Sequence, residues 1–129
     1  MKRKLLAILL SMVTVLSVCS MTLVSVYAAE KSVTLTVDDK WVESETILAT
    51  ASKAKVYNAA SSKHRVYGII QYKSGADYIN DKQFLVSIGD TETSNSSSTF
   101  MSSKYWRIQL NPYGVATKGC TATGTIYSR

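Results

Sequence analysis

Few residues of this 129-residue chain have side chains suited to nucleophilic catalysis. It has one histidine, His64, and two cysteines, Cys19 and Cys120. A cysteine nucleophile needs a base within reach and an accessible, electropositive setting that favours the thiolate. Cys19 lies in the apolar leader discussed below. The one set that suits covalent chemistry is therefore His64 and Cys120, with the later Arg129 as the cation.

The order histidine, cysteine, arginine is similar to that of the sortase transpeptidases, secreted all-β enzymes, and this resemblance would make Cys120 the nucleophile. The Thr-Leu-x-Thr-Cys motif of that family is replaced here by Ala116-Thr117-Lys118-Gly119-Cys120. In one unbroken strand Cys120 and Arg129 would point to opposite faces and lie about 30 Å apart. Cys120 also alternates in phase with Ala122 and Ile126, as a small hydrophobic core residue does. We therefore expect no enzyme activity, with sortase-like chemistry as an alternative.

The sequence also gives little indication of a metal site or of a catalytic acid/base pair. A structural zinc site needs four ligands, and the chain after residue 29 offers one histidine and one cysteine. The segment Asp90–Asn95 has oxygen ligands but lacks the distant glutamate of a calcium loop. Asp38 with Asp39, and Glu43 with Glu45, lack an apolar setting that would raise the pKa of a catalytic acid. We expect no metal, no cofactor and no catalytic residue.

Residues 1–29 have the composition of a secretory signal peptide. A positive head, Lys2-Arg3-Lys4, precedes 25 uncharged residues that end in Ala28-Ala29. We expect cleavage after one of these alanines. The product is then secreted, free or loosely held at the cell surface, with no membrane partner. A retained anchor is the alternative, because the uncharged run is long enough to cross a bilayer core of about 30 Å.

The net charge of the remaining 100 residues limits the classes of binding partner that we expect, and their number indicates a single domain. Without the leader, 12 basic residues face 9 acidic ones, so the net charge falls from +6 to +3. This mild, evenly spread charge does not indicate nucleic-acid binding, but it suits loose attraction to an anionic cell envelope. We expect one domain, residues 30–129, long enough to bury about two thirds of its unfolded surface and to fold alone.

Short strands and turns account for most of this domain. The alternation in Ser32–Val37 puts Val33, Leu35 and Val37 on one side of a strand. Strands are also predicted at Thr46–Ala51, Lys55–Asn58, Arg65–Tyr72 and Gln83–Ile88, the last with Phe84, Val86 and Ile88 inward. We expect a turn at Lys73–Asp77, a long loop over Asp90–Ser103 tethered at Phe100, and a weak helix candidate at Trp41–Lys55.

The clearest alternation is at the C-terminal end. Even-numbered apolar residues alternate with polar ones over Tyr105–Leu110 and again over Cys120–Tyr127. We expect these two strands to pair antiparallel, with Leu110 opposite Cys120, Ile108 opposite Ala122 and Trp106 opposite Gly124. Six or seven short strands with one apolar face need a second sheet to cover that face. The sequence therefore predicts an all-β fold, a small antiparallel β-sandwich, with a barrel as second choice.

The expected outer face of this last hairpin is the candidate ligand-binding surface. It would carry Tyr105, Arg107, Gln109, Thr121, Thr123, Thr125 and Tyr127. Aromatic rings beside hydroxyls and a guanidinium can stack on sugar rings or anchor a protein partner. Such residues also simply suit an exposed strand. Trp41 is a second candidate anchor, the alternative being a core residue at a strand start.

We therefore predict a secreted, non-catalytic binding protein for a cell-wall polysaccharide or a protein partner. A bacteriocin-like or toxin-like protein is the alternative of a different class, because small, mildly cationic exported β-proteins include bacteriocins.

Overall fold

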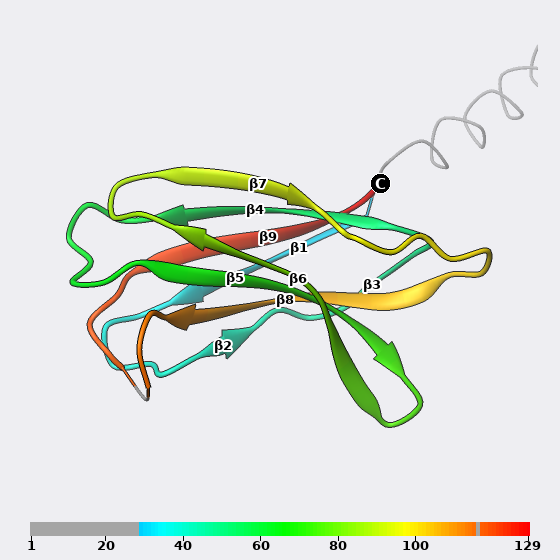
Figure 1. Ribbon diagram of the computed structural model, residues 1–129, viewed down its shortest axis with the longest axis horizontal. Coiled ribbons are helices and arrows are strands. Elements are labelled where there is room, and N and C mark those ends of the chain that lie inside the picture. Colours follow the sequence, from blue (N-terminus) through cyan, green and yellow to red (C-terminus); the bar gives the residue numbers. More distant parts are fainter. Residues whose placement is uncertain (1–28, 116) are drawn as a thin grey trace, which may run out of the picture.

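A computed structural model describes residues 29–115 and 117–129 (Figure 1). The expected signal peptide and its anchor alternative fall on residues 1–28, outside the described part. The described residues form nine strands and no helix, so they contain no helix able to span a bilayer. The weak helix candidate at Trp41–Lys55 is wrong, because this segment contributes to three strands.

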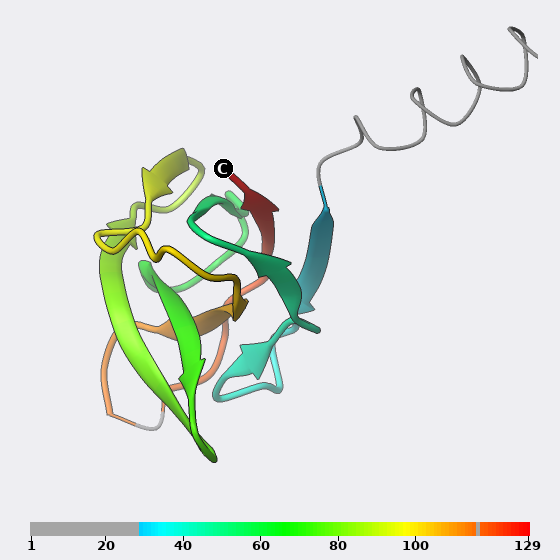
Figure 2. The same cartoon turned by 90° about the vertical axis from the view of Figure 1, so that its right-hand side faces the viewer.

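The described strands form two antiparallel sheets that pack face to face, which confirms the β-sandwich. Figure 2 views it from the end that holds the C-terminus. The four-stranded sheet has the order β1 (Glu30–Leu35), β9 (Ala122–Ser128), β4 (Ser52–Asn58), β7 (Thr91–Asn95). The five-stranded sheet has the order β2 (Val42–Glu43), β8 (Lys104–Pro112), β5 (Val66–Ser74), β6 (Asp77–Val86), and β3 (Ile47–Ala49) also pairs with β8.

The core lies between the sheets and follows the alternation of the strands. Trp106 is fully buried, and its indole nitrogen donates to the Ala49 carbonyl oxygen at 2.8 Å, so its polar atom is satisfied. The Trp106 ring packs against Tyr72 at 5.5 Å and Phe100 at 5.8 Å between centroids. The expected tether at Phe100 is thus confirmed, and it closes the loop after β7 over the core.

The expected pairing of β8 with β9 is wrong. Strand β8 pairs with β2, β3 and β5, whereas β9 pairs with β1 and β4, and the two face each other across the core. A Cβ at Gly124 would lie 2.9 Å from Leu110 Cδ2. Gly124 therefore makes room for Leu110 of the opposite sheet, not for Trp106 beside it. Alternation says which side of a strand is buried, but not whether two apolar strands are neighbours or face each other.

Several strand boundaries also differ from expectation. Val37 and Ile88, expected inward, are 53% and 44% exposed because their strands end at Leu35 and Val86. The expected loop Asp90–Ser103 begins with β7, whose polar residues pair with β4 at the edge of the sheet. The turn at Lys73–Asp77 is confirmed as the β5–β6 hairpin, where Gly75 has φ of 64°.

At one end of the sandwich, on the left in Figure 1, three loop segments are joined by backbone hydrogen bonds. We call these three segments the loop end: residues 36–41, residues 59–65, and the described residues of the loop after β8, 113–115 and 117–121. The Gly119 amide donates to Val37 O at 2.9 Å, and the Lys63 amide donates to Gly119 O at 3.0 Å. The Tyr113 amide donates to Arg65 O at 2.8 Å. The described N-terminus and the C-terminus meet at the opposite end, where the Ser128 amide bonds Ala29 O.

Candidate binding site

The seven predicted site residues do not share one face. Tyr105, Arg107 and Gln109 lie on the outer face of the five-stranded sheet, since the even-numbered residues of β8 point into the core. The other four belong to the opposite sheet: Thr123, Thr125 and Tyr127 on β9, with Thr121 just before it. The single surface expected from a β8–β9 hairpin is therefore wrong, because these strands belong to different sheets.

On the five-stranded face, Arg107 is the centre of a polar network. Its Nε donates to Gln71 Oε1 at 2.8 Å, and its NH1 lies 2.8 Å from Glu43 Oε2. The guanidinium stacks on Tyr78, 3.5 Å from the ring centroid, and Gln71 Nε2 donates to Asn80 Oδ1 at 2.7 Å. Only 18% of the Arg107 side chain is exposed. Arg107 therefore organises this face rather than projecting from it.

Two exposed side chains lie toward the β3 end of the same face. Tyr105 and Leu48 are opposite one another in register and are 51% and 55% exposed. Gln109 lies farther along β8, and its amide nitrogen donates to Glu43 Oε1 at 3.2 Å. Tyr105 is thus half-exposed, whereas Gln109 is partly buried and held by Glu43.

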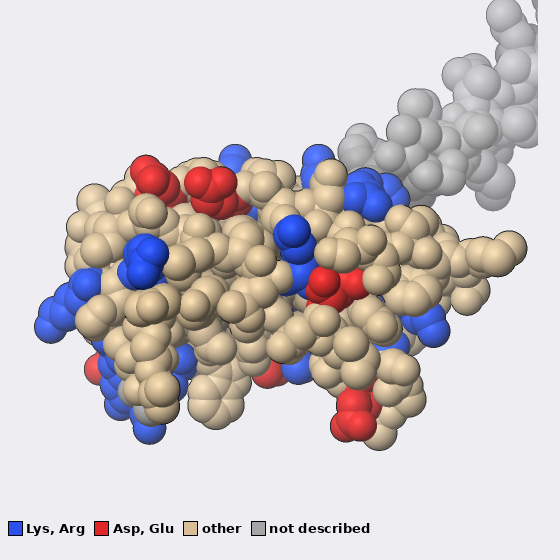
Figure 3. Space-filling model, viewed as in Figure 1, with Lys and Arg blue, Asp and Glu red and all other residues tan. Residues whose placement is uncertain are grey.

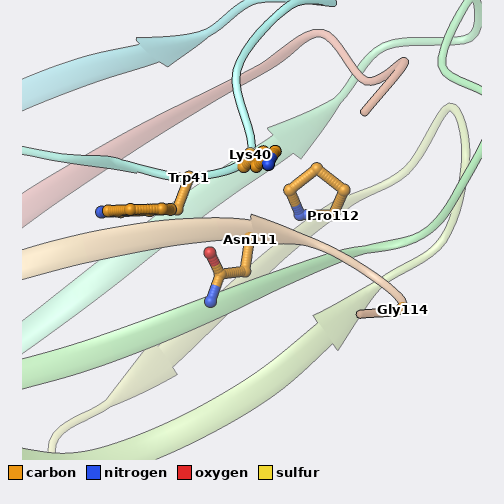
Figure 4. A pocket seen from close by; sticks show the side chains of 5 residues that line it. All are labelled: Lys40, Trp41, Asn111, Pro112 and Gly114. Carbon is orange, nitrogen blue, oxygen red and sulfur yellow. The ribbon is translucent and has the colours of Figure 1, made fainter. Parts of the chain in front are cut away.

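The other end of this face holds a hollow of about 370 Å³ beside Trp41. Trp41 is 57% exposed, so the core alternative for this residue is wrong. Figure 4 shows the lining side chains coming from two segments: the one entering β2 and the end of β8. The indole is seen edge-on in that view and runs along β8. The lining residues are Lys40, Trp41, Asn111, Pro112 and Gly114.

Two tyrosines enlarge this site on the side away from Trp41. Tyr67 on β5 lies opposite Asn111 in register, and its ring is 5.6 Å from that of Tyr113. Arg65 Cζ lies 4.5 Å from the Tyr113 centroid. Asn111 is therefore flanked by aromatic residues on both sides. We call Trp41, Tyr67, Asn111 and Tyr113, with the hollow, the aromatic hollow.

Sequence reasoning found Trp41 but missed the other members of the aromatic hollow. A signal was present for Tyr67, which alternates out of phase with the buried Val66, Gly68 and Ile70 and so belongs outside. No comparable signal was available for Asn111 or Tyr113. Their roles depend on the pairing of β5 with β8, which alternation within a strand does not specify.

Trp41 is the aromatic residue that lines the hollow itself, and Tyr67 and Tyr113 lie beside Asn111. Aromatic walls with a few converging polar groups are typical of ligand sites. The Asn111 amide can both donate and accept, and the Lys40 ammonium can donate. None of the described residues lining the hollow is a carboxylate, histidine or cysteine. Over the described part of the chain, no group of three or more His, Cys, Asp or Glu side chains is placed to hold a metal ion.

The four-stranded sheet presents a different surface. Thr34, Thr123, Tyr57 and Thr91 form one row across its four strands. In the next row, Ser32 and Thr125 share a hydrogen bond of 2.7 Å between their hydroxyl oxygens. This face is rich in hydroxyls, and its aromatic Tyr57 is 45% exposed and lies outside the hollow beside Trp41.

The three residues of the sortase-like hypothesis are not brought together. Cys120 is fully buried, and its thiol donates to the backbone carbonyl of His64 at 3.3 Å. Arg129 lies at the other end of the molecule, where its guanidinium contacts Ser96 O at 3.5 Å and Thr99 Oγ1 at 3.1 Å. This set therefore lacks the accessible thiol that nucleophilic attack requires.

The carboxylate pairs make local contacts. The Asp39 carboxylate accepts hydrogen bonds from the Thr36 amide at 2.9 Å and the Thr36 hydroxyl at 2.8 Å. These bonds hold the pKa of Asp39 below its ordinary value. Glu43 is paired with Arg107, and Glu45 lies 3.2 Å from Lys31 Nζ. Each contact stabilises a loop or a strand edge.

Comparison with known proteins gives the fold and no more. No family model matches the chain, and no curated protein matches its sequence. A solved structure entitled "Crystal structure of PirA" is similar with a TM-score of 0.51 at 14% identity, over 78% of this chain and 93% of that one. The Yersinia pseudotuberculosis-derived mitogen (YPM) gives 0.47 at 8% identity, over 79% and 85%. The chain therefore shares the β-sandwich fold of PirA.

Proposed function

We propose that this protein is a secreted, non-catalytic binding protein that recognises a saccharide of the cell envelope at the aromatic hollow. The observation that carries the proposal is the half-exposed indole of Trp41 beside a hollow edged by the Asn111 amide and the Lys40 ammonium. A half-exposed indole offers apolar area that a ligand can cover, and the hollow beside it gives the ligand a place to lie next to polar groups.

A saccharide fits this combination of groups. The C–H face of a pyranose is flat and apolar and stacks on an indole, while its hydroxyls need donors and acceptors at the ring edge. Asn111 supplies both, and Lys40 supplies donors. Because β2 and β8 form a regular pair next to Trp41, little conformational entropy is lost on binding.

The rest of the β8 face extends the site along a polymer. From Asn111 to Tyr105 the strand covers about 20 Å. Gln109 and Tyr105 lie on the same outer side, with Arg107 holding the surface between them. The predicted residues Tyr105, Arg107 and Gln109 would then form one surface that contacts further sugar units of the polymer. The β9 residues Thr123, Thr125 and Tyr127, with Thr121 just before the strand, remain a predicted second surface, on the other sheet.

Retention on purified, insoluble cell-wall polysaccharide tests the proposal. Trp41→Ala should lose at least about tenfold in retention, the loss expected when one central aromatic anchor is removed. Tyr57→Ala, which removes an aromatic that is 45% exposed on the other sheet, is the matched control and should bind like the wild type. No retention of the wild type on such polymers, or equal retention of Trp41→Ala, would contradict the proposal.

The toxin-like alternative remains a prediction from small size, mild positive charge and the export signal. It is separated from the proposed function by adding the mature chain to neighbouring bacterial strains. Growth inhibition that persists in Trp41→Ala would favour the toxin over the saccharide binder.

A further inference from the structure

The loop end carries large apolar side chains that nothing in the described chain covers. Val115 is 101% exposed at the tip of its loop, and Val37 is 53% exposed. Trp41 and Tyr113, in the same loops, are 57% and 44% exposed. Val37 and Trp41 lie on one loop, and Tyr113 and Val115 lie on another. Trp41 and Tyr113 also belong to the aromatic hollow, whereas Val37 and Val115 do not. Four exposed apolar or aromatic side chains thus gather on two loops that are joined by a backbone hydrogen bond, and grouped exposure of this kind indicates an interaction surface where single exposed residues do not.

Basic side chains surround these four residues. Lys40, Lys63, Arg65 and Lys118 lie in the loop-end segments, and Lys and Arg gather at this end in Figure 3. The same segments hold two carboxylates, Asp38 and Asp39, and the adjacent loop adds Asp90. The Asp39 carboxylate is occupied by Thr36, as described above. Cations outnumber carboxylates at this end, and their long side chains reach farther from the backbone.

The loop end is also a preformed platform. Three backbone hydrogen bonds of 2.8 to 3.0 Å join its segments, and the Arg65 guanidinium stacks on Tyr113. Its apolar tips therefore need little ordering before they contact a surface. The described N-terminus and the C-terminus both lie at the opposite end, so neither obstructs an approach from this side.

We infer that the loop end docks onto the surface of an anionic lipid bilayer. Val115 and Val37 enter the boundary between headgroups and acyl chains, and Trp41 and Tyr113 occupy the interfacial layer that their amphipathic rings prefer. The surrounding lysines contact anionic headgroups. This inference departs from the sequence-based expectation of no membrane partner, and it does not depend on the proposed saccharide binding.

A bilayer fits these observations better than a protein partner does. The hollows at this end are lined mostly by polar and small residues: one by Val37, Asp38, Ser61, Lys63, Lys118 and Gly119, the other by the residues around Trp41. Neither hollow is the well-packed apolar core that a protein interface requires. A fluid headgroup layer can accommodate side chains that extend from two loops. The Trp, Tyr and Lys combination also matches the composition of membrane–water interfaces.

Sedimentation with vesicles of phosphatidylglycerol and phosphatidylcholine, compared with pure phosphatidylcholine, tests the inference on the mature chain. We expect binding to the anionic vesicles, weakened by salt. Trp41 emission should shift to the blue on binding, while the fully buried Trp106 contributes a constant background. Val115→Asp should reduce partitioning by about tenfold or more, because it replaces an inserted apolar group with a charge.

A matched control is available at the other end. Met101 is 105% exposed on the loop between β7 and β8, whose Thr99 is hydrogen-bonded to the C-terminal Arg129. Met101→Asp therefore makes the same kind of change away from the loop end and should bind vesicles like the wild type. Asn111→Ala should retain vesicle binding and lose saccharide binding, which separates the two proposals. No vesicle binding by the wild type, or equal loss in Val115→Asp and Met101→Asp, would overturn the inference.

Discussion

The outer faces of the two sheets carry different groups of side chains, although in both sheets buried residues alternate with more exposed ones along the main strands. On the four-stranded face, hydroxyls line up in rows, and the aromatic Tyr57 lies outside the hollow beside Trp41. On the five-stranded face, Trp41 and Tyr67 flank Asn111, and a network around Arg107 fixes the surface beside them. The difference shows that the side-chain groups on a sheet face depend on which residues neighbouring strands bring together, not on the alternation of one strand.

An irregularity in the β5–β6 hairpin contributes to this difference. The register shifts between Ile70 and Gln71, as at a β-bulge, and Figure 1 shows the hairpin turning away from the other strands. Bulges increase local twist and redirect side chains. Beyond the shift, Tyr78 lies over Arg107 and Asn80 accepts from Gln71, so the outer face is curled around the guanidinium. In the four-stranded sheet the pairings of the described strands run without such a shift.

The largest effect should follow a change in the core that both faces share. Trp106→Ala removes a fully buried indole and its hydrogen bond to Ala49. We expect a loss of about 3–5 kcal/mol in the free energy of unfolding, measured by urea denaturation. The two sheets should unfold in one transition, so the outer faces of both should lose their structure together. A loss below about 1 kcal/mol would mean that Trp106 does not join the two sheets.

A smaller effect should come from the close approach of β9 and β8. Gly124→Val places a side chain against Leu110, where a Cβ alone would lie 2.9 Å from Cδ2. Overpacking of this kind costs about 1–3 kcal/mol. Combining it with Leu110→Ala should cost less than the sum of the two single losses, because the residues contact each other. Strict additivity would contradict the face-to-face arrangement.

The two faces can be compared directly with one substitution on each. Arg107→Ala leaves Gln71 Oε1 and the Glu43 carboxylate without their partner, and Gln71 is only 6% exposed. We expect a loss of about 1–2 kcal/mol, reduced by solvent screening of the partly exposed ion pair. Thr125→Ala removes one exposed hydroxyl bond and should cost no more than about 0.5 kcal/mol. Equal losses would remove the contrast between an organised face and a plain one.

The smallest effect should be a dependence on pH at the loop end. Because the folded-state pKa of Asp39 is lowered by the Thr36 hydrogen bonds, its contribution to stability is present above the ordinary aspartate pKa of about 4. That contribution should be lost as pH falls through the lowered pKa. Asp39→Asn should therefore flatten the acid limb of the stability curve, measured as unfolding midpoints between about pH 2 and 6. An unchanged curve would contradict this role.

The sequence predicted which residues are buried better than it predicted which strands are neighbours. Trp106, Ile108, Cys120 and Ile126 are buried as expected, because alternation within a strand is a local property. The pairing of β8 with β5 depends on residues far apart in the chain, which a local pattern does not specify. For this reason the seven predicted site residues, expected on one face, are divided: three lie on β8 and four lie on the other sheet. Tyr67 and Tyr113 could not be grouped with Trp41 for the same reason.

The location of the site on the five-stranded face is tested most directly by the two indole N–H signals in a ¹H–¹⁵N spectrum. Soluble fragments of cell-wall polysaccharide should shift the signal of the exposed Trp41 and leave that of the buried Trp106 in place. A Trp41→Phe variant assigns the signals. Shifts confined to backbone amides of β9, with Trp41 unmoved, would place binding on the four-stranded sheet and contradict the site assigned here.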